Sequence, residues 1–309
     1  MIPNSIKDKI INKAYELGFQ KIGFANADFF EDDQEKLYSW IDKNYHANMQ
    51  WIDKRKEERS NILKYFPEVK TVISFGYNYY SGRGSEISSE YKFSNYAWGN
   101  DYHIIIKKYL FNLVGYMQTV LDDFNYRVCV DTSPLMEKKW AVRSGIGWIG
   151  KHTNLITRDY GSWLFLGEIL IDKQIEPDQF YDDDLCGTCT ACIDECPTDA
   201  IIEPYVLDSN KCISYLTIEH RGDIPDDKKD KMDNWMYGCD VCQEVCPWNI
   251  KFETKTDDSN FYIREGIQNK KKISDWNIDK TEFNQIFRKS AVKRTKYEGL
   301  TRNIELIKK

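Results

Sequence analysis

The cysteines of this 309-residue chain limit its possible folds more than any other feature. Eight of the nine lie between Cys186 and Cys246. They form two runs with Cys212 between them, Cys186-x-x-Cys189-x-x-Cys192-x-x-x-Cys196-Pro197 and Cys239-x-x-Cys242-x-x-x-Cys246-Pro247. Paired cysteines at this density indicate an iron–sulfur, zinc or disulfide framework.

The spacing is the bacterial ferredoxin pattern for two [4Fe–4S] clusters. In that pattern three thiolates of a run bind one cluster, and the fourth, before a proline, binds the other. One predicted cluster therefore has the ligands Cys186, Cys189, Cys192 and Cys246. The other has the ligands Cys196, Cys212, Cys239 and Cys242. The seven cysteines of the two runs and Cys212 are all used.

Zinc and disulfides are the alternatives for these cysteines. Zinc binds Cys-x-x-Cys pairs in tetrahedral sites, but a tight triple followed by Cys-Pro suits a cluster better. Disulfide frameworks belong to small secreted domains in an oxidising compartment. We therefore expect two clusters, with zinc as the main alternative.

The composition indicates a folded protein without a membrane segment. The chain is 41% hydrophobic and 14% aromatic, which is typical of globular proteins. It has no run of about 18 apolar residues and no secretory or twin-Arg signal at its start. We expect a cytoplasmic, monomeric protein with no membrane partner.

The charge is unevenly distributed along the chain. Residues 265–309 contain 12 basic and 6 acidic residues, although the whole chain has a net charge of −6. A basic tail on an acidic body points to nucleic acid, and its alternative is a solvated helical face.

The hydrophobic pattern predicts three regions. Residues 1–180 alternate helices and strands, as in an α+β (α/β-like) domain with a mixed sheet. Residues 181–255 form the ferredoxin-like cluster domain, and residues 256–309 form a short helical, basic C-terminal extension. The predicted helices cover 5–17, 35–66, 101–124, a segment from 134, and 281–289. The predicted strands cover 21–25, 71–76 and 126–130, with a hairpin of 154–158 and 162–171.

Single residues mark the expected ends and core contacts of these helices. Ser5 is expected to cap the first helix and Gly18 to end it. Trp51 is a candidate core residue of the charged helical segment. Pro134 suits the first position of a helix capped by Ser133.

Residues 145–151, Gly-Ile-Gly-Trp-Ile-Gly-Lys, contain the letters of a dinucleotide-binding motif. That motif must follow a strand and open a helix, whereas here a helix precedes it and a strand follows. The stretch also approaches a Walker A loop, but His152 replaces the Ser or Thr that binds magnesium. We instead expect a tight glycine turn that lets the backbone approach a large planar or phosphate-bearing ligand.

Asp131 follows a predicted strand, at the strand end where α/β folds place ligands. Apolar surroundings would raise the pKa of its carboxyl, which could then act as a general acid near neutral pH. The alternative is that Asp131 caps the turn through Thr132 and Ser133. Asp101-x-His103 is similar to the start of a cobalt-ligating motif, but Ile106 stands where glycine is required, so His103 is expected to be an ordinary helix residue.

Three stretches together resemble the epoxyqueuosine reductase family. They are Val130-Asp-Thr-Ser-Pro-Leu-Met-Glu137, Arg143-Ser-Gly-Ile-Gly-Trp-Ile-Gly-Lys151 and the cysteines from Cys186 to Cys246. Further matches are residues 98–103, 212–217 and 237–243. The resemblance covers about residues 1–250 and, more weakly, residues 287–303.

The resemblance implies a cobalamin-dependent enzyme. The N-terminal domain would hold base-off cobalamin against the cluster domain, with Asp131 as proton donor beside the cobalt. The residues at the family's cobalamin-lining positions are Arg59, Ser94, Asp131, Thr153, Leu155, Ile156, Thr157, Ser214 and Gln243.

The implied reaction reduces epoxyqueuosine to queuosine at the wobble position of tRNA with a GUN anticodon. Electrons from an external flavodoxin or ferredoxin system would pass through the clusters to cobalt, and cob(I)alamin would act as the nucleophile. Four aromatic residues are candidates for stacking on the substrate base, namely Tyr79, Tyr80, Tyr91 and Phe93, and for half of them packing in the core is the favoured alternative. Some relatives add a C-terminal helical-repeat domain; without one, the basic tail would take more of the RNA binding.

Two other functions remain as alternatives. A reductive dehalogenase uses the same cofactors but usually carries a twin-Arg signal. A ferredoxin-type electron carrier would need neither cobalamin nor Asp131.

Overall fold

A four-stranded sheet organises the N-terminal half of this computed structural model, which describes residues 2–83 and 86–308. The strands are β1 (Lys21–Asn26), β2 (Thr71–Asn78), β4 (Tyr126–Cys129) and β7 (Leu164–Ile171), in the order β1-β2-β7-β4. All three pairings are antiparallel. The α+β class is therefore confirmed, but the expected mixed sheet is wrong, because alternating helices and strands do not specify strand direction.

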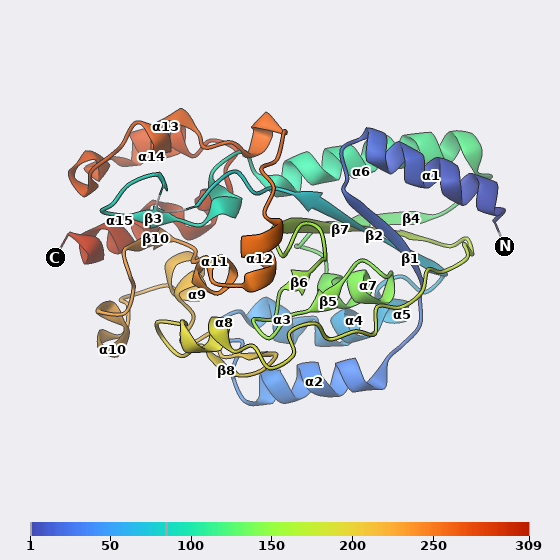
Figure 1. Cartoon of the computed structure of the whole chain (residues 1–309), viewed down its shortest axis with the longest axis horizontal. Helices are drawn as coiled ribbons and strands as arrows, with labels where there is room; N and C mark the ends of the chain where they lie inside the picture. The colour runs from blue at the N-terminus through green and yellow to red at the C-terminus, as the bar shows by residue number, and fades with distance from the viewer. Residues whose placement is uncertain (1, 84–85, 309) are drawn as a thin grey trace.

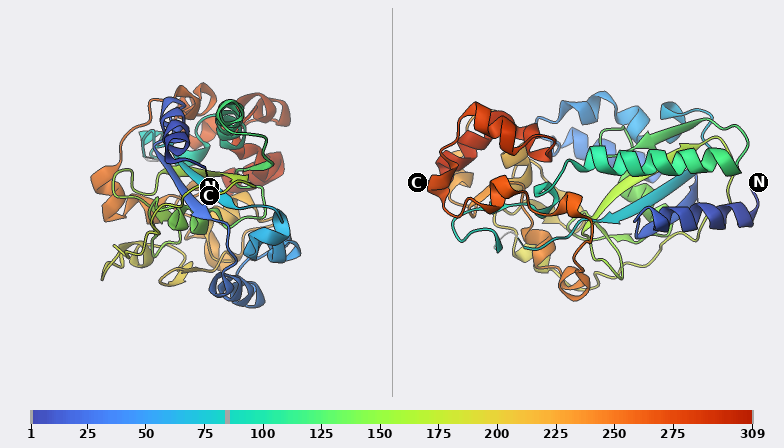
Figure 2. Two further views of the ribbon diagram at one scale, coloured as in Figure 1. Left: turned by 90° about the vertical axis from the view of Figure 1, so that its right-hand side faces the viewer. Right: turned by 90° about the horizontal axis from the view of Figure 1, so that it is seen from above.

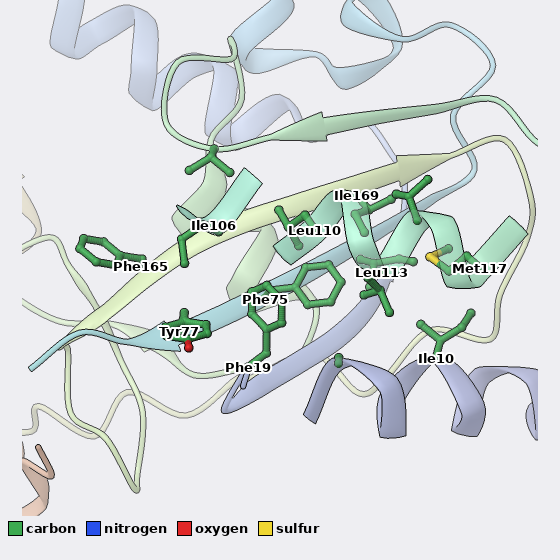
Figure 3. Packing of buried hydrophobic residues seen from close by; sticks show 14 of the residues in the cluster. Ile10, Phe19, Phe75, Tyr77, Ile106, Leu110, Leu113, Met117, Phe165 and Ile169 are labelled. Atoms are coloured by element: carbon green, nitrogen blue, oxygen red, sulfur yellow. The ribbon is translucent and has the colours of Figure 1, made fainter. Parts of the chain in front are cut away.

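Helices cover both faces of this sheet (Figure 1). On one face, α1 (Asn4–Glu16) and α6 (Tyr102–Val120) pack against alternate strand residues such as Ile73, Phe75 and Ile169. Figure 3 shows Leu110 and Leu113 of α6 directed at this layer. On the other face, α5 (Ile62–Tyr65) and α7 (Glu137–Arg143) pack against the opposite set, including Val72 and Leu170. The period-2 alternation of the strands thus makes two separate cores.

Several predicted element ends differ from the structure. Pro3, not Ser5, stands at the N-cap of α1. The segment predicted as helical over 35–66 is divided into α2 (Glu31–Asp42), α3 (Gln50–Lys54), α4 (Lys56–Ser60) and α5. Trp51 is 42% exposed and is not a core residue. The helix after β4 begins at Glu137, because residues 132–135 form a turn in which Leu135 N–H donates to Ser133.

The predicted hairpin of residues 154–158 and 162–171 is wrong. β6 (Leu155–Ile156) instead pairs with β5 (Trp148–Ile149), and β7 enters the main sheet between β2 and β4. Only an isolated bridge between Thr157 and Gly161 closes the predicted turn. The long apolar β7 gains more burial in the centre of the sheet than beside a two-residue strand.

Short elements connected by loops make up the cysteine region. They are α8 (Ala191–Asp194), β8 (Ile201–Glu203), β9 (Val206–Leu207), α9 (Ile213–Ile218), α10 (Asp226–Lys229), β10 (Trp235–Tyr237), α11 (Val241–Glu244) and α12 (Pro247–Phe252). β3 (Lys92–Phe93), from the loop after β2, pairs in parallel with β10. That loop, of which residues 84 and 85 lie outside the described part, therefore joins the two regions.

The C-terminal segment is folded onto this region. It contains α13 (Glu265–Gln268), α14 (Lys280–Ile286) and α15 (Lys296–Ile307), and Figure 2 places the two chain ends at opposite ends of the long axis. Trp276 and Phe287 pack with Phe93 and Tyr237 in one hydrophobic cluster. The Arg302 guanidinium donates to the carbonyl oxygens of Leu216, His220 and Gly222, so part of the basic charge has a structural use. The helical character is confirmed, and the role in RNA binding stays a prediction.

In the described residues, no helix is both long and apolar enough to span a membrane.

Candidate active site

Asp131 and His103 come from different elements and meet beyond the end of β4. Asp131 follows this strand in the left-handed backbone region (φ 57°), and His103 lies in the first turn of α6. Asp131 Oδ2 lies 3.0 Å from His103 Nε2, and Asp101 Oδ1 lies 2.7 Å from His103 Nδ1. Asp101 also caps α6, because its carboxylate accepts the backbone N–H of His103. One imidazole therefore bridges two carboxylates.

The protonation of this trio follows from its charges. Burial alone would lower the pKa of His103, but hydrogen bonds to Asp101 and Asp131 outweigh it and raise that pKa to about 9. Burial alone would raise the pKa of Asp131, but the hydrogen bond and charge of His103 outweigh it, and that pKa is lowered. The expectation of a raised pKa for Asp131 is therefore wrong. At neutral pH the shared proton resides on His103.

Two buried carboxyl groups lie behind Asp131. The backbone N–H of Asp131 donates to Glu137 Oε1 in the first turn of α7. Glu168 on β7 is fully buried, and neither carboxyl oxygen has a hydrogen-bond partner among the described residues. Burial and the charge of Asp131 raise the pKa of Glu137 to about 8. Burial and nearby Glu137 raise the pKa of Glu168 well above its usual range, so we assign it as neutral at physiological pH.

A cavity of about 360 Å³ opens in front of Asp131 and is lined by both regions of the chain. Its wall contains the predicted cofactor-binding residues Ser94, Asp131, Thr153, Leu155, Ser214 and Gln243. The same wall contains the four predicted ligands of the second cluster, Cys196, Cys212, Cys239 and Cys242. The structure thus brings the predicted proton donor and one predicted cluster site to the same cavity.

A second cavity of about 880 Å³ meets the first at Asp131, Glu137, Lys138 and Thr153. Arg59, another predicted cofactor-binding residue, lies in its wall. The wall is rich in basic side chains, since it also contains Lys36, Lys43, Lys138 and Lys139. Asp131 is 58% exposed because it faces these two cavities.

The other two predicted cofactor-binding residues, Ile156 and Thr157, are fully buried and line neither cavity. Ile156 packs with Trp148 and Cys246. The Thr157 hydroxyl donates to the carbonyl oxygen of Gly161.

The aromatic residues proposed to stack on a base are all buried. Tyr79, Tyr80, Tyr91 and Phe93 are at most 6% exposed. Tyr79 stacks on Phe165 at 4.3 Å between ring centroids, and Phe93 packs against Trp276. These rings are occupied by protein neighbours, so their proposed role in base stacking is wrong.

Two of the glycines in residues 145–151 lie against other parts of the chain's own backbone. A Cβ added at Gly147 would lie 2.1 Å from the carbonyl oxygen of Ile156, and one at Gly145 (φ 74°) would lie 2.6 Å from that of Gln179. These glycines allow close approach of the chain's own backbone. The expected approach of a ligand to the glycine faces is therefore wrong.

Hydrogen bonds hold the two sides of the first cavity together. Ser94 Oγ donates to Asp240 Oδ1 at 2.5 Å, and Asn95 N–H donates to Asp240 Oδ2 at 2.7 Å. Ser162 Oγ donates to Gln243 Oε1 at 2.8 Å. Predicted cofactor-binding residues from each region, Ser94 and Gln243, are therefore fixed across the boundary.

Neighbouring thiols shift the pKa values of the clustered cysteines. All are free thiols. Burial and the thiols of Cys246, Cys186 and Cys189 raise the pKa of Cys192 to about 11, so these four side chains lie near one another. Burial and the nearby groups Cys212, Asp240, Cys196 and Cys192 raise the pKa of Cys242. Because Cys192 belongs to the other predicted group, the division into two ligand sets stays a prediction. Within the described residues, no three His, Cys, Asp or Glu side chains are grouped as ligands of a single metal ion.

Comparison with known proteins identifies the family. Residues 185–249 match the model described as "4Fe-4S double cluster binding domain", and residues 59–132 match "Epoxyqueuosine reductase QueG, DUF1730". The chain is 44% identical to epoxyqueuosine reductase of Leadbetterella byssophila, with 96% of each chain covered. It belongs to the epoxyqueuosine reductase family. It is 43% identical to the Synechocystis sp. epoxyqueuosine reductase, with 92% of this chain and 99% of that one covered.

Solved structures of epoxyqueuosine reductases have the same fold. A crystal structure with an epoxyqueuosine-modified tRNA stem loop has a TM-score of 0.89 and 29% identity, and the alignment covers 98% of this chain and 81% of that one. The Streptococcus thermophilus epoxyqueuosine reductase has a TM-score of 0.82 and 29% identity, with 98% and 80% covered. The expected α+β enzyme, an epoxyqueuosine-reducing oxidoreductase with a double-cluster domain, is confirmed. The electron-carrier and dehalogenase alternatives are set aside.

His103 and Glu137 are the site residues that sequence reasoning missed. His103 had a visible signal, since Asp101-x-His103 places a carboxylate next to an imidazole at a helix start. The only sequence signal for Glu137 was its place at the end of the Val130–Glu137 stretch that resembles the family.

Proposed function

We propose that this chain reduces epoxyqueuosine to queuosine in tRNA with cobalamin and two [4Fe–4S] clusters. The observation that carries the proposal is the position of the Asp131–His103 pair. Asp131, which contacts His103, lies in the wall of a cavity, and the same wall contains the four cysteines of one predicted cluster. A proton source and an electron source would then face one reaction space.

The donor set suits two clusters. Eight cysteines, four for each predicted cluster, match the ligand requirement of two [4Fe–4S] clusters. Cys189 of the first group is exposed, whereas the second group lines the cavity. We propose that electrons from a flavodoxin- or ferredoxin-type donor enter at the first cluster and leave from the second.

The cavity walls suit a large, amide-bearing cofactor such as cobalamin. Buried Arg59 Nε and His152 Nε2 have no hydrogen-bond partner among the described residues, and buried polar atoms normally have one. His152 lines the first cavity and Arg59 the second. Ser94, Thr153, Leu155, Ser214 and Gln243 would hold the cofactor with them, while Ile156 and Thr157 would support the wall from behind.

Bound cobalamin would supply a strongly reducing cobalt nucleophile for opening the epoxide. The residues of this chain supply the proton. His103 holds it at Nε2, and Asp131 Oδ2, at 3.0 Å, can pass it to the oxygen released from the substrate. Asp101 stabilises the imidazolium, and Glu137 fixes the backbone of Asp131.

The substrate side of the proposal rests on the second cavity. A wobble base must leave the anticodon stack to reach an enclosed site. The basic side chains Lys36, Lys43 and Lys139 beside Asp131 suit the phosphates of such a loop. A relative crystallised with an epoxyqueuosine-modified stem loop supports this substrate. We propose a GUN-anticodon tRNA as substrate, and a monomeric, cytoplasmic enzyme.

The test is turnover by the anaerobically reconstituted protein. Protein with cobalamin, clusters and a one-electron reductant should convert epoxyqueuosine in an anticodon stem loop to queuosine. Conversion that is unaffected by omitting cobalamin would contradict the proposal.

A further inference from the structure

Lys151 ends the glycine motif, which neither nucleotide binding nor the proposed reaction explains. It follows β5, in the turn that leads to β6. It is only 9% exposed. Its Nζ donates to the carbonyl oxygen of Gly187 at 2.7 Å and to that of Cys189 at 2.9 Å. A lysine of the N-terminal region therefore binds the loop that carries two predicted ligands of the first cluster.

The glycine motif allows Lys151 to take this position. Gly147 lies so close to Ile156 that any side chain there would separate the β5–β6 hairpin. The backbone N–H of Tyr205 donates to the carbonyl oxygen of Lys151 at 3.0 Å and holds its main chain as well. The hairpin is thus anchored at the base of the lysine side chain.

The ammonium group of Lys151 is paired only with carbonyl dipoles. Both of its hydrogen-bond acceptors in the described residues are main-chain oxygens. The carboxylate of Asp184, two residues before Cys186, accepts hydrogen bonds from the backbone N–H of Cys186 and the hydroxyl of Tyr205. A positive charge that is buried in this way is screened less than one in solvent.

We propose that Lys151 is a positioning residue for the first cluster: it holds the Cys186–Cys189 loop in its ligating conformation and raises the reduction potential of the cluster on that loop. Net charge and hydrogen bonding near a cluster set its potential, and a nearby cation favours the reduced, more negative form. The inference rests on the proposed function only in requiring that both clusters are present.

Three variants separate the two parts of this role. Lys151→Gln removes the positive charge but keeps an N–H donor for one carbonyl oxygen. Lys151→Met removes the charge and the donor. Lys151→Arg keeps the charge and the donors. Lys13→Met is the control: Lys13 is a partly exposed lysine of α1 that pairs with Glu16, and α1 lies away from the helices of the cysteine region (Figure 1). Iron content and the midpoint potential of each cluster are measured on anaerobically purified protein by spectroscopic redox titration. The first cluster's signal is the one missing from Cys246→Ala.

We expect about eight iron per wild-type chain. Lys151→Gln should keep that content but lower the midpoint potential of the first cluster alone. Lys151→Met should lose part of the first cluster's iron, and the fraction of that cluster that remains should show the same lowered potential. Lys151→Arg and Lys13→Met should behave as wild type.

Unchanged potentials in iron-loaded Lys151→Gln and Lys151→Met would overturn the inference. If Lys151→Met does not fold, Lys151→Gln decides alone. If both neutral variants unfold while Lys151→Arg folds, Lys151 is a general structural residue and the inference is equally wrong. A wild-type chain that binds no iron would instead overturn the proposed function, so the two failures are distinguishable.

Discussion

His103 Nε2 lies 3.0 Å from Asp131 Oδ2, although the two residues are 28 positions apart in the chain. The contact places a protonated imidazole against the carboxylate that faces both cavities. The acid of this site is therefore a pair in which His103 stores the proton and Asp131 presents it. This view changes what substitutions at the site should do.

Asp131→Asn tests the presenting half of the pair. The amide keeps the shape of the side chain but cannot relay a proton, so we expect turnover of epoxyqueuosine tRNA to fall by about 10²–10⁴-fold. Iron content and the base-off cobalamin spectrum should stay as in wild type. Wild-type turnover by a correctly loaded variant would remove Asp131 from the mechanism.

His103→Gln tests the storing half through the pH profile. In wild type the proton is lost as pH rises through about 9, the raised pKa of His103, so activity should fall on that alkaline side. Without His103 the pKa of Asp131 rises, because burial still raises it while the hydrogen bond and charge that lower it are gone. The variant's activity should then decline at a much lower pH. The measurement is kcat/KM against pH, and an unshifted alkaline limb in the variant would contradict the assignment.

Glu168→Gln tests whether burial of the Glu168 carboxyl behind Asp131 destabilises the folded protein as pH rises. The pKa of Glu168 is raised in the folded state, so its contribution to stability is full below about pH 4.3 and is lost as pH rises toward the folded value. Glutamine does not titrate. The variant's Tm relative to wild type should therefore increase between pH 5 and pH 8, by about 2 °C for each kcal/mol recovered.

Glu16→Gln, on the exposed end of α1, is the control for this comparison and should show no such trend. Parallel Tm curves for wild type and Glu168→Gln across this pH range would show that Glu168 is not held neutral by the fold.

Pairs of cysteine substitutions test whether the cysteine before the proline of each run binds the cluster of the other run. Cys246→Ala combined with Cys186→Ala removes two ligands of the same predicted cluster and should leave about four iron per chain. Cys246→Ala combined with Cys239→Ala affects both clusters and should remove nearly all iron. The reverse result would mean that each run holds its own cluster.

Local sequence patterns predicted much of this fold but not its long-range pairings. The cysteine spacing predicted two groups of four, and the apolar periods located α1, α6 and the main strands. The direction of β7 and its place between β2 and β4 depend on burial in the assembled sheet, which no local pattern encodes.

The chemistry of the site was predicted less well for a related reason. Asp131 was identified by its place after a strand, but its pKa was assigned the wrong direction because His103 could not be seen as a neighbour. Tyr91 and Phe93 were proposed for base stacking because their loop looked polar, whereas their partners Trp276 and Phe287 lie nearly 200 residues later.

The central claim is that cobalamin and both clusters act together on epoxyqueuosine at the cavity of Asp131. The most direct measurement is mass spectrometry of the modified nucleoside after incubation of an epoxyqueuosine-containing anticodon stem loop with anaerobically reconstituted protein and a one-electron reductant. We predict that the nucleoside loses one oxygen atom and becomes queuosine only when cobalamin and iron-loaded protein are both present. An unchanged nucleoside with the fully loaded protein, or equal conversion without cobalamin, would contradict the claim.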